Sequence, residues 1–157
     1  MLNDLLGAIW RRAPKLLKRW TVRMSHPRFA VTAGAIVTDQ RGRVLLLKHR
    51  FRPGSGWGMP GGFIEGGEQP EEALRRELRE EVGLEIGEAK LITVRAFKDP
   101  QQVEIVFSCQ AAGDTDQLNF EIQRVAWFCP EELPKGLPKN QAKLIRRALA
   151  DGAGPQD

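Results

Sequence analysis

Hydrophobic and polar residues follow two different periods along this chain, which together predict a domain built from strands and helices. Alternating or short uninterrupted apolar stretches bounded by turn residues predict strands, whereas apolar residues three or four positions apart predict helices. The expected strands span residues 31–38, 44–48, 85–97, 103–111 and 120–128. The expected helices span residues 71–82 and 138–149. One helix therefore interrupts the strands and another follows them.

The first 23 residues carry a separate helical pattern with a basic polar side. Apolar residues recur at helical spacing from Leu2 to Trp20, and Pro14 divides or kinks the segment. Residues 1–28 hold seven Lys or Arg and one acid, whereas the rest of the chain holds 17 basic and 19 acidic residues. We expect residues 1–28 to be a basic amphipathic extension that packs on the domain or on a second subunit of a homodimer. Peripheral contact of residues 1–23 with an anionic membrane is the alternative, and nucleic-acid binding is disfavoured.

The composition is that of one soluble domain. The chain has 157 residues, of which 41% are hydrophobic and 28% are charged. We expect the domain to span residues 29–150 and a flexible tail to span residues 151–157. Cys109 and Cys129 have neither CxxC spacing nor a neighbouring histidine cluster. We therefore expect both cysteines to be small buried side chains, and the protein to be cytoplasmic. No apolar run approaches the roughly 20 residues that a membrane span needs.

The helix expected at residues 71–82 carries the clearest candidate chemistry. Glu77, Glu80 and Glu81 are spaced so that three carboxylates share one face, where they repel one another. A hard divalent cation reverses that cost, because Mg²⁺ binds carboxylate oxygens together with substrate phosphates. A Glu- and Arg-rich helix is otherwise most often a solvent-exposed helix. Glycines at positions 61, 62, 66 and 67 favour the metal site, because they allow a ligand to approach the backbone closely.

One segment, residues 62–84, reads GFIEGGEQPEEALRRELREEVGL. This segment resembles the Nudix box, the signature of the Nudix (MutT-like) hydrolases, at every fixed position. The resemblance implies an α+β fold of the α/β/α sandwich type, with a mixed sheet between helices and the motif on a loop–helix–loop. It also implies a hydrolase that uses Mg²⁺ or Mn²⁺ to cleave nucleoside diphosphates linked to another moiety.

The resemblance assigns roles within the motif. The residues implied in metal binding are Glu77, Glu80 and Glu81 together with the backbone carbonyl of Gly61. Arg76 would hold Glu77, and Glu68 would brace the loop. The other structural positions of the motif are Gly62 and Gly83, of which Gly83 also supplies a left-handed stop for the helix.

The general base lies either within the motif or well after it. Among the implied catalytic residues are Arg76, Glu77 and Glu121, and the carboxylate that takes the proton from the attacking water is Glu77 or Glu121. Glu104 is a weaker alternative. The competing interpretation of Glu121 is a polar residue of an edge strand, and that of Glu104 is a solvent-facing strand residue.

The loop at residues 49–58 is the candidate for substrate binding. Its basic and aromatic residues, which suit the phosphates and base of a nucleotide, are Arg50, Phe51, Arg52 and Trp57. The alternative is a flexible surface loop. Pro100 lies 16 positions after the motif, as in ADP-ribose pyrophosphatases, and the chain contains no tyrosine. We therefore expect ADP-ribose or a nucleotide sugar as substrate, with an oxidised nucleoside triphosphate, or nucleotide binding without turnover, as alternatives.

Overall fold

The computed structural model describes residue 14 and residues 27–115 and 117–150. Apart from residues 14, 27 and 28, the expected basic extension lies outside the described residues, and so does the expected tail at residues 151–157. None of the helices within the described ranges is long and apolar enough to cross a membrane.

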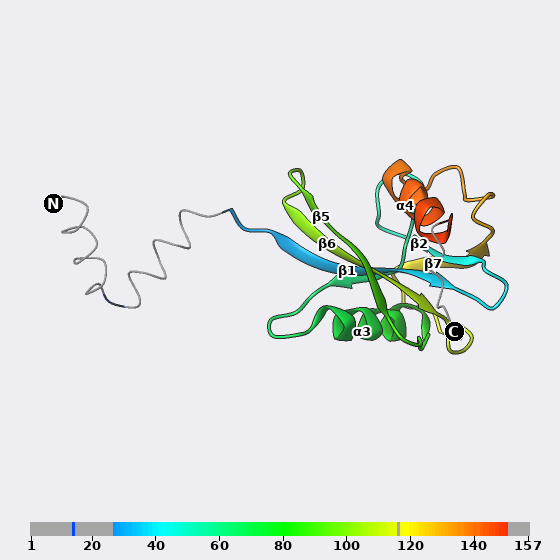
Figure 1. Ribbon diagram of the computed structural model, residues 1–157, viewed down its shortest axis with the longest axis horizontal. Coiled ribbons are helices and arrows are strands. Elements are labelled where there is room, and N and C mark those ends of the chain that lie inside the picture. The colour runs from blue at the N-terminus through cyan, green and yellow to red at the C-terminus, as the bar shows by residue number, and fades with distance from the viewer. Residues whose placement is uncertain (1–13, 15–26, 116, 151–157) are drawn as a thin grey trace.

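A mixed sheet of seven strands forms the centre of the domain (Figure 1). The strands are β1 (Ala30–Thr38), β2 (Val44–His49), β3 (Trp57–Gly58), β4 (Gly61–Phe63), β5 (Lys90–Phe97), β6 (Gln102–Gln110) and β7 (Ile122–Phe128). Their order is β3-β2-β1-β6-β5, with β4 paired to β1 and β7 paired to β2. The strands β1 and β6 run parallel, and the other pairs of this sheet are antiparallel. The predicted mixed sheet is therefore confirmed.

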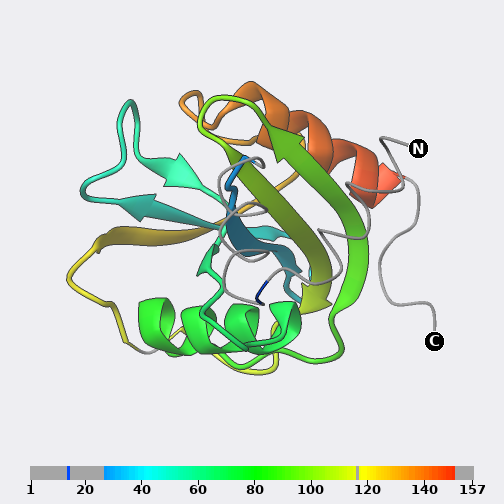
Figure 2. The same ribbon diagram turned by 90° about the vertical axis from the view of Figure 1, so that its left-hand side faces the viewer.

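Two helices cover opposite faces of the sheet (Figures 1 and 2). The helix α3 (Pro70–Val82) buries Leu74 and Leu78 against the side chains of β1, β2 and β6 that point to its face. The helix α4 (Lys139–Ala150) buries Ile145 and Ala148 against the opposite face, where Ile36 and Leu46 point. Because successive side chains of a strand point to opposite faces, each strand of the centre contributes to both cores. The predicted sandwich is confirmed.

Local signals determine where α3 begins and ends. Pro70 occupies the first turn, where its missing N–H has no helical partner to lose. The backbone N–H of Gln69 donates to the Glu72 carboxylate at 3.0 Å, which satisfies one of the free donors at the helix start. Gly83 then adopts a left-handed conformation with φ of 69° and closes the helix.

The structure differs from the sequence prediction at several positions. The strands β3 and β4 lie where Gly and Pro residues predict loop, because backbone pairing to β2 and β1 overrides the local preference. Of the segment before β5, only Ile86 pairs, as an isolated bridge to Ala111. Cys109 is buried as predicted, but the prediction for Cys129 is wrong, because β7 ends at Phe128 and the thiol side chain is exposed.

Candidate active site

Arg76 joins the acidic residues of the motif to one another and to the loop before them. Its Nε and Nη2 atoms donate to the two carboxylate oxygens of Glu68 at 2.9 and 3.1 Å. Its Nη1 atom donates to Glu77 at 2.9 Å and to Glu80 at 3.3 Å. Its Nη2 atom also donates to the Phe63 carbonyl oxygen, at the end of β4, at 3.0 Å. One guanidinium therefore connects α3, the loop and the sheet.

Glu68 binds the Arg76 guanidinium in a bidentate geometry. Its carboxylate also accepts a hydrogen bond from the backbone N–H of Glu65 at 3.0 Å. The hydrogen bonds from Arg76 and then from Glu65 lower the pKa of Glu68, so that it remains ionised. A bidentate pair of this kind fixes the orientation of both partners. The contact gives Glu68 a means to brace the loop, and the role itself stays a prediction.

Gly61 and Gly62 bring the β4 backbone against α3. Gly61 has a φ of +134°, and a Cβ there would collide with the backbone of Ala33 and Gly34. A Cβ on Gly62 would overlap the carboxylate of Glu77. Glycine at both positions therefore allows a close approach that other residues would block.

Glu81 is the buried carboxylate of the site. Its side chain receives a long hydrogen bond from the Gly61 backbone N–H, at 3.4 Å to Oε2. Burial raises the pKa of Glu81 to about 7, and the negative charges of Glu77 and Glu121 add to the effect. Arg52 acts in the opposite direction through its positive charge. Glu81 is thus close enough to both Glu77 and Glu121 to interact with each electrostatically.

His49 is a neighbour of Glu81 that sequence reasoning missed. Its Nδ1 atom lies 3.9 Å from Glu81 Oε1, and its Nε2 atom is buried without a hydrogen-bond partner. Burial, and then the positive charge of Arg52, lowers the pKa of His49 to about 4. The imidazole is therefore neutral at pH 7, and its contact with Glu81 is not an ion pair. A single histidine at a strand end carries no sequence signal for this placement.

The donor chemistry of Glu77 and Glu81 suits a divalent cation. Both supply carboxylate oxygens, and the charge of Glu77 disfavours ionisation of Glu81, a cost that a cation would remove. Glu80 is more than half exposed and lies against Arg76. Among the described residues, no group of three or more His, Cys, Asp or Glu side chains is arranged to hold a metal ion. The three-carboxylate site stays a prediction.

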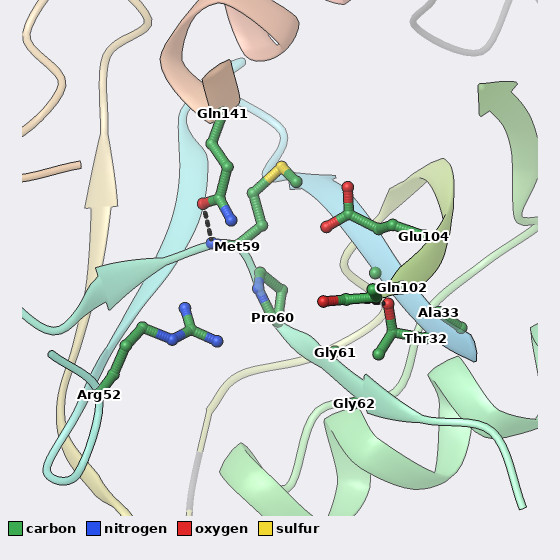
Figure 3. A pocket seen from close by; sticks show the side chains of 11 residues that line it. Thr32, Ala33, Arg52, Met59, Pro60, Gly61, Gly62, Gln102, Glu104 and Gln141 are labelled. Carbon is green, nitrogen blue, oxygen red and sulfur yellow. Dashed lines mark hydrogen bonds between the residues drawn. The ribbon is translucent and has the colours of Figure 1, made fainter. Parts of the chain in front are cut away.

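A small pocket of about 80 Å³ opens beside the Gly61–Gly62 segment (Figure 3). Its polar lining side chains are Thr32, Arg52, Gln102, Glu104 and Gln141. They come from β1, β6, the loop after β2, and the first turn of α4. The Gln141 side-chain oxygen accepts the backbone N–H of Met59 at 3.0 Å, which links α4 to the segment before β4. Gln102 and Gln141 carry no signal in the sequence, because neither belongs to a motif.

Arg52 points into this pocket and has spare hydrogen-bonding capacity. Its Nη1 atom is buried and has no hydrogen-bond partner. Its guanidinium lies so close to Gly58 that a Cβ there would overlap it. Burial lowers the pKa of Arg52, while the charges of Glu81 and Glu104 partly offset this. An unpaired guanidinium beside the motif is a candidate donor to a substrate phosphate or carbonyl.

The other loop residues expected to bind substrate are separated from Arg52. Arg50 donates through Nε to the Phe120 carbonyl oxygen at 3.0 Å. Phe51 is exposed, and its ring meets that of Phe120 edge to face with centroids 6.1 Å apart. Trp57 packs edge to face on Phe128 at 5.2 Å, within the core beneath α4. Arg50 therefore contacts the Phe120 backbone whereas Arg52 lines the pocket, so the two side chains do not bind at one place.

The two later glutamates have different surroundings. Glu121 is exposed, in the turn before β7, and not in the strand where the sequence analysis placed it. Glu104 is bound by the Nε and Nη2 atoms of Arg95, whose guanidinium lies 5.3 Å from the centre of the Phe97 ring. Of the two, Glu121 has the freer carboxylate.

The model of the NUDIX domain family matches residues 28–148. The chain belongs to the NUDIX domain family. NUDIX enzymes are pyrophosphohydrolases acting on phosphoric anhydrides of small nucleotide substrates, generally with divalent metal ions. The expected hydrolase class is thereby confirmed, whereas the expectation of an ADP-ribose-like substrate stays a prediction.

Similar proteins include NUDIX relatives of known sequence and structure. A MutT-like protein of Streptomyces ambofaciens is 32% identical over 131 residues, which are 83% of each chain. The nucleoside triphosphatase NudI of Salmonella newport is 39% identical over 90 residues, which are 49% of this chain and 64% of that protein. The crystal structure of a MutT NUDIX hydrolase from Burkholderia pseudomallei superposes with a TM-score of 0.68 and 28% identity, over 76% of this chain and 97% of that one.

Proposed function

We propose that this chain hydrolyses a nucleoside triphosphate to a nucleoside monophosphate and pyrophosphate. The observation that carries the proposal is the placement of Glu77 and Glu81 beside the Gly61–Gly62 backbone, which lines the pocket that Arg52 enters, with Glu121 near enough to Glu81 to affect its ionisation. Negative groups around an open glycine segment suit a cation-bound polyphosphate. The similarity to a nucleoside triphosphatase and to a MutT-like protein supports this substrate class.

The carboxylates of Glu77, Glu80 and Glu81 and the backbone carbonyl of Gly61 would hold Mg²⁺ or Mn²⁺. A bound cation neutralises phosphate charge and lowers the pKa of the attacking water. Arg76 orients Glu77 and Glu80 through its Nη1 atom, and Glu68 keeps Arg76 in place. Arg52 donates to the substrate from inside the pocket.

Glu121 is the proposed general base. Its carboxylate is exposed, in a turn next to Glu81, where it can accept a proton from water. Glu77 is less suited, because the Arg76 guanidinium already bonds its carboxylate. Glu104 is less suited too, because it is paired with Arg95 on the pocket side of the sheet.

ADP-ribose or a nucleotide sugar is the second candidate substrate. Its support is Pro100, which lies in the turn two positions before Gln102, a residue of the pocket wall. The expected substrate-binding loop adds no support, since Arg50 contacts the Phe120 backbone and only Arg52 lines the pocket. Cleavage within the diphosphate of ADP-ribose would release AMP and ribose 5-phosphate.

Product analysis separates the two substrates. The full chain is incubated with nucleoside triphosphates, 8-oxo-dGTP, ADP-ribose and a nucleotide sugar at equal concentrations, with Mg²⁺ and Mn²⁺ in turn. We expect pyrophosphate and a nucleoside monophosphate from a triphosphate, at the highest kcat/KM of the set. A higher kcat/KM for ADP-ribose would replace the first candidate by the second. Absence of any product would leave a nucleotide-binding domain without turnover, which equilibrium binding of the same compounds would reveal.

A further inference from the structure

A short turn with its own internal hydrogen bonds carries Glu121. The backbone N–H of Ile122 donates to the Asn119 carbonyl oxygen at 3.0 Å, which closes a turn with Phe120 and Glu121 at its centre. The backbone N–H of Glu121 donates to the Asn119 side-chain oxygen at 3.2 Å. Asparagine is favoured at such a position because its side chain can bond the backbone two residues later. The direction of the Glu121 backbone is thus determined locally.

Three hydrogen bonds to two other segments determine where the turn lies. The backbone N–H of Asn119 donates to the carbonyl oxygen of Glu81 at 3.0 Å, which attaches the turn to the end of α3. Arg50 holds both central carbonyl groups: its backbone N–H donates to Glu121 at 2.7 Å, and its Nε atom donates to Phe120 at 3.0 Å. The hydrogen bond to the Phe120 carbonyl oxygen depends on the side chain of Arg50. The turn is therefore held between the end of β2 and the end of α3.

We propose that Arg50 is a positioning residue, whose side chain fixes the turn that holds the Glu121 carboxylate next to Glu81. This role rests on the proposed function in one respect, the assignment of Glu121 as general base. It replaces the substrate contact that the sequence suggested for Arg50. A guanidinium suits the task because it is always charged and presents several donors in a fixed plane. The edge-to-face contact of Phe51 with Phe120 supports the same turn from the neighbouring residue.

Kinetics of Arg50 variants test the catalytic part of the proposal. Arg50→Ala removes one charge-assisted hydrogen bond, which we expect to lower kcat roughly tenfold with KM changed less than about twofold. Arg50→Lys keeps a charged donor and should recover part of the lost kcat. Arg41→Ala, in the exposed turn between β1 and β2, is the matched control and should leave both constants unchanged. A raised KM with unchanged kcat for Arg50→Ala would show substrate contact and overturn the proposal.

A double-mutant cycle asks whether Arg50 acts through Glu121. In the Glu121→Gln background, Arg50→Ala should have almost no further effect on kcat, because the base that it positions is already absent. If the fold losses of kcat in the two single variants multiply in the double variant, Arg50 does not act through Glu121. That result would overturn the proposed role.

Hydrogen exchange tests the attachment of the turn without any activity measurement. In Arg50→Ala, the backbone amides of Glu121 and Ile122 should exchange at least about tenfold faster than in the wild-type protein. The same amides should be unchanged in Arg41→Ala. Unchanged exchange in Arg50→Ala would overturn the proposed attachment. If the wild-type protein hydrolyses no nucleotide, the proposed function fails, and hydrogen exchange alone then decides whether Arg50 holds the turn.

Discussion

The carboxylate of Glu77 lies in the space that a β-carbon on residue 62 would need. A Cβ built on Gly62 would be closer than 3.0 Å to three atoms of that carboxylate and to no backbone atom of another segment among its nearest contacts. The backbone of Gly62 does not have a positive φ. The requirement for glycine at position 62 is therefore a requirement for space beside Glu77.

Replacing Gly62 by alanine should consequently displace the Glu77 carboxylate without breaking the fold. We expect Gly62→Ala to lower kcat at least about tenfold, because a displaced catalytic group loses its orientation. The melting temperature should change by only a few degrees, because the atoms that a Cβ would displace lie at the end of the flexible Glu77 side chain. Gly113→Ala is the control, since Gly113 lies outside the motif and a Cβ there meets nothing within 4 Å. Equal activity of the two variants would contradict the argument.

Charge-neutral replacement of the carboxylates should separate their roles. Glu77→Gln keeps the size of the side chain but weakens a cation ligand, so kcat should fall at least about 100-fold. Raising the Mg²⁺ concentration should recover part of this loss. Glu121→Gln should lower kcat by a similar amount at saturating Mg²⁺, with no recovery. Full activity of Glu121→Gln would transfer the role of general base to Glu77.

Glu81 should make the metal-free protein less stable as the pH rises. Its pKa of about 7 in the fold exceeds its ordinary value of 4.5, so the fold favours the protonated carboxyl. That contribution is fully present below about pH 4.5 and is lost as the pH rises through about 7. Since one pKa unit corresponds to about 1.4 kcal/mol, the ionised carboxylate costs about 3 kcal/mol at pH 8.

The variant Glu81→Gln tests this directly, because its side chain remains neutral. In EDTA, we expect its free energy of unfolding to exceed that of the wild-type protein at pH 8, by an amount that shrinks toward pH 5. Urea unfolding at pH 5, 6.5 and 8 provides the measurement. The same variant should lose at least about 100-fold in kcat with Mg²⁺ present. A pH-independent difference in unfolding free energy would show that Glu81 ionises normally in the fold.

The two cysteines should differ in reactivity. Cys129 is exposed, whereas burial raises the pKa of the Cys109 thiol to about 12. The thiolate is the reactive form, so Cys109 should resist alkylation at pH 8. Mass spectrometry after iodoacetamide treatment should find one modified residue, Cys129, in the native protein and two after unfolding in urea. Native modification of Cys109 would indicate that the α3 side of the core opens.

The parts of the site that follow from local chemistry could be predicted from the sequence. Pro70 and Gly83 bound α3 because each acts through its own backbone geometry. The spacing of Glu77 and Glu81 puts both on one helical face, whatever the rest of the fold does. The signature residues therefore lie where their pattern indicates.

Contacts between distant segments could not be predicted in this way. Arg50 and Arg52 are two positions apart and chemically identical, yet one bonds a carbonyl 70 residues later and the other enters a pocket completed by β6 and α4. Their directions depend on neighbours that no local pattern specifies. The same holds for β4, whose glycines form a strand only because β1 lies beside them.

The parallel pairing of β1 with β6 also has a consequence for synthesis of the chain. Ala30 pairs with Gln102, 72 positions later, whereas the partners of β1 on its other side are complete by Phe63. During translation, the edge of β1 that pairs with β6 stays unpaired until residues 102–110 have emerged from the ribosome. An unpaired strand edge is a template for association with other chains. The interval before residue 110 leaves the ribosome is therefore when nascent chains of this protein are most exposed to mispairing and to capture by chaperones.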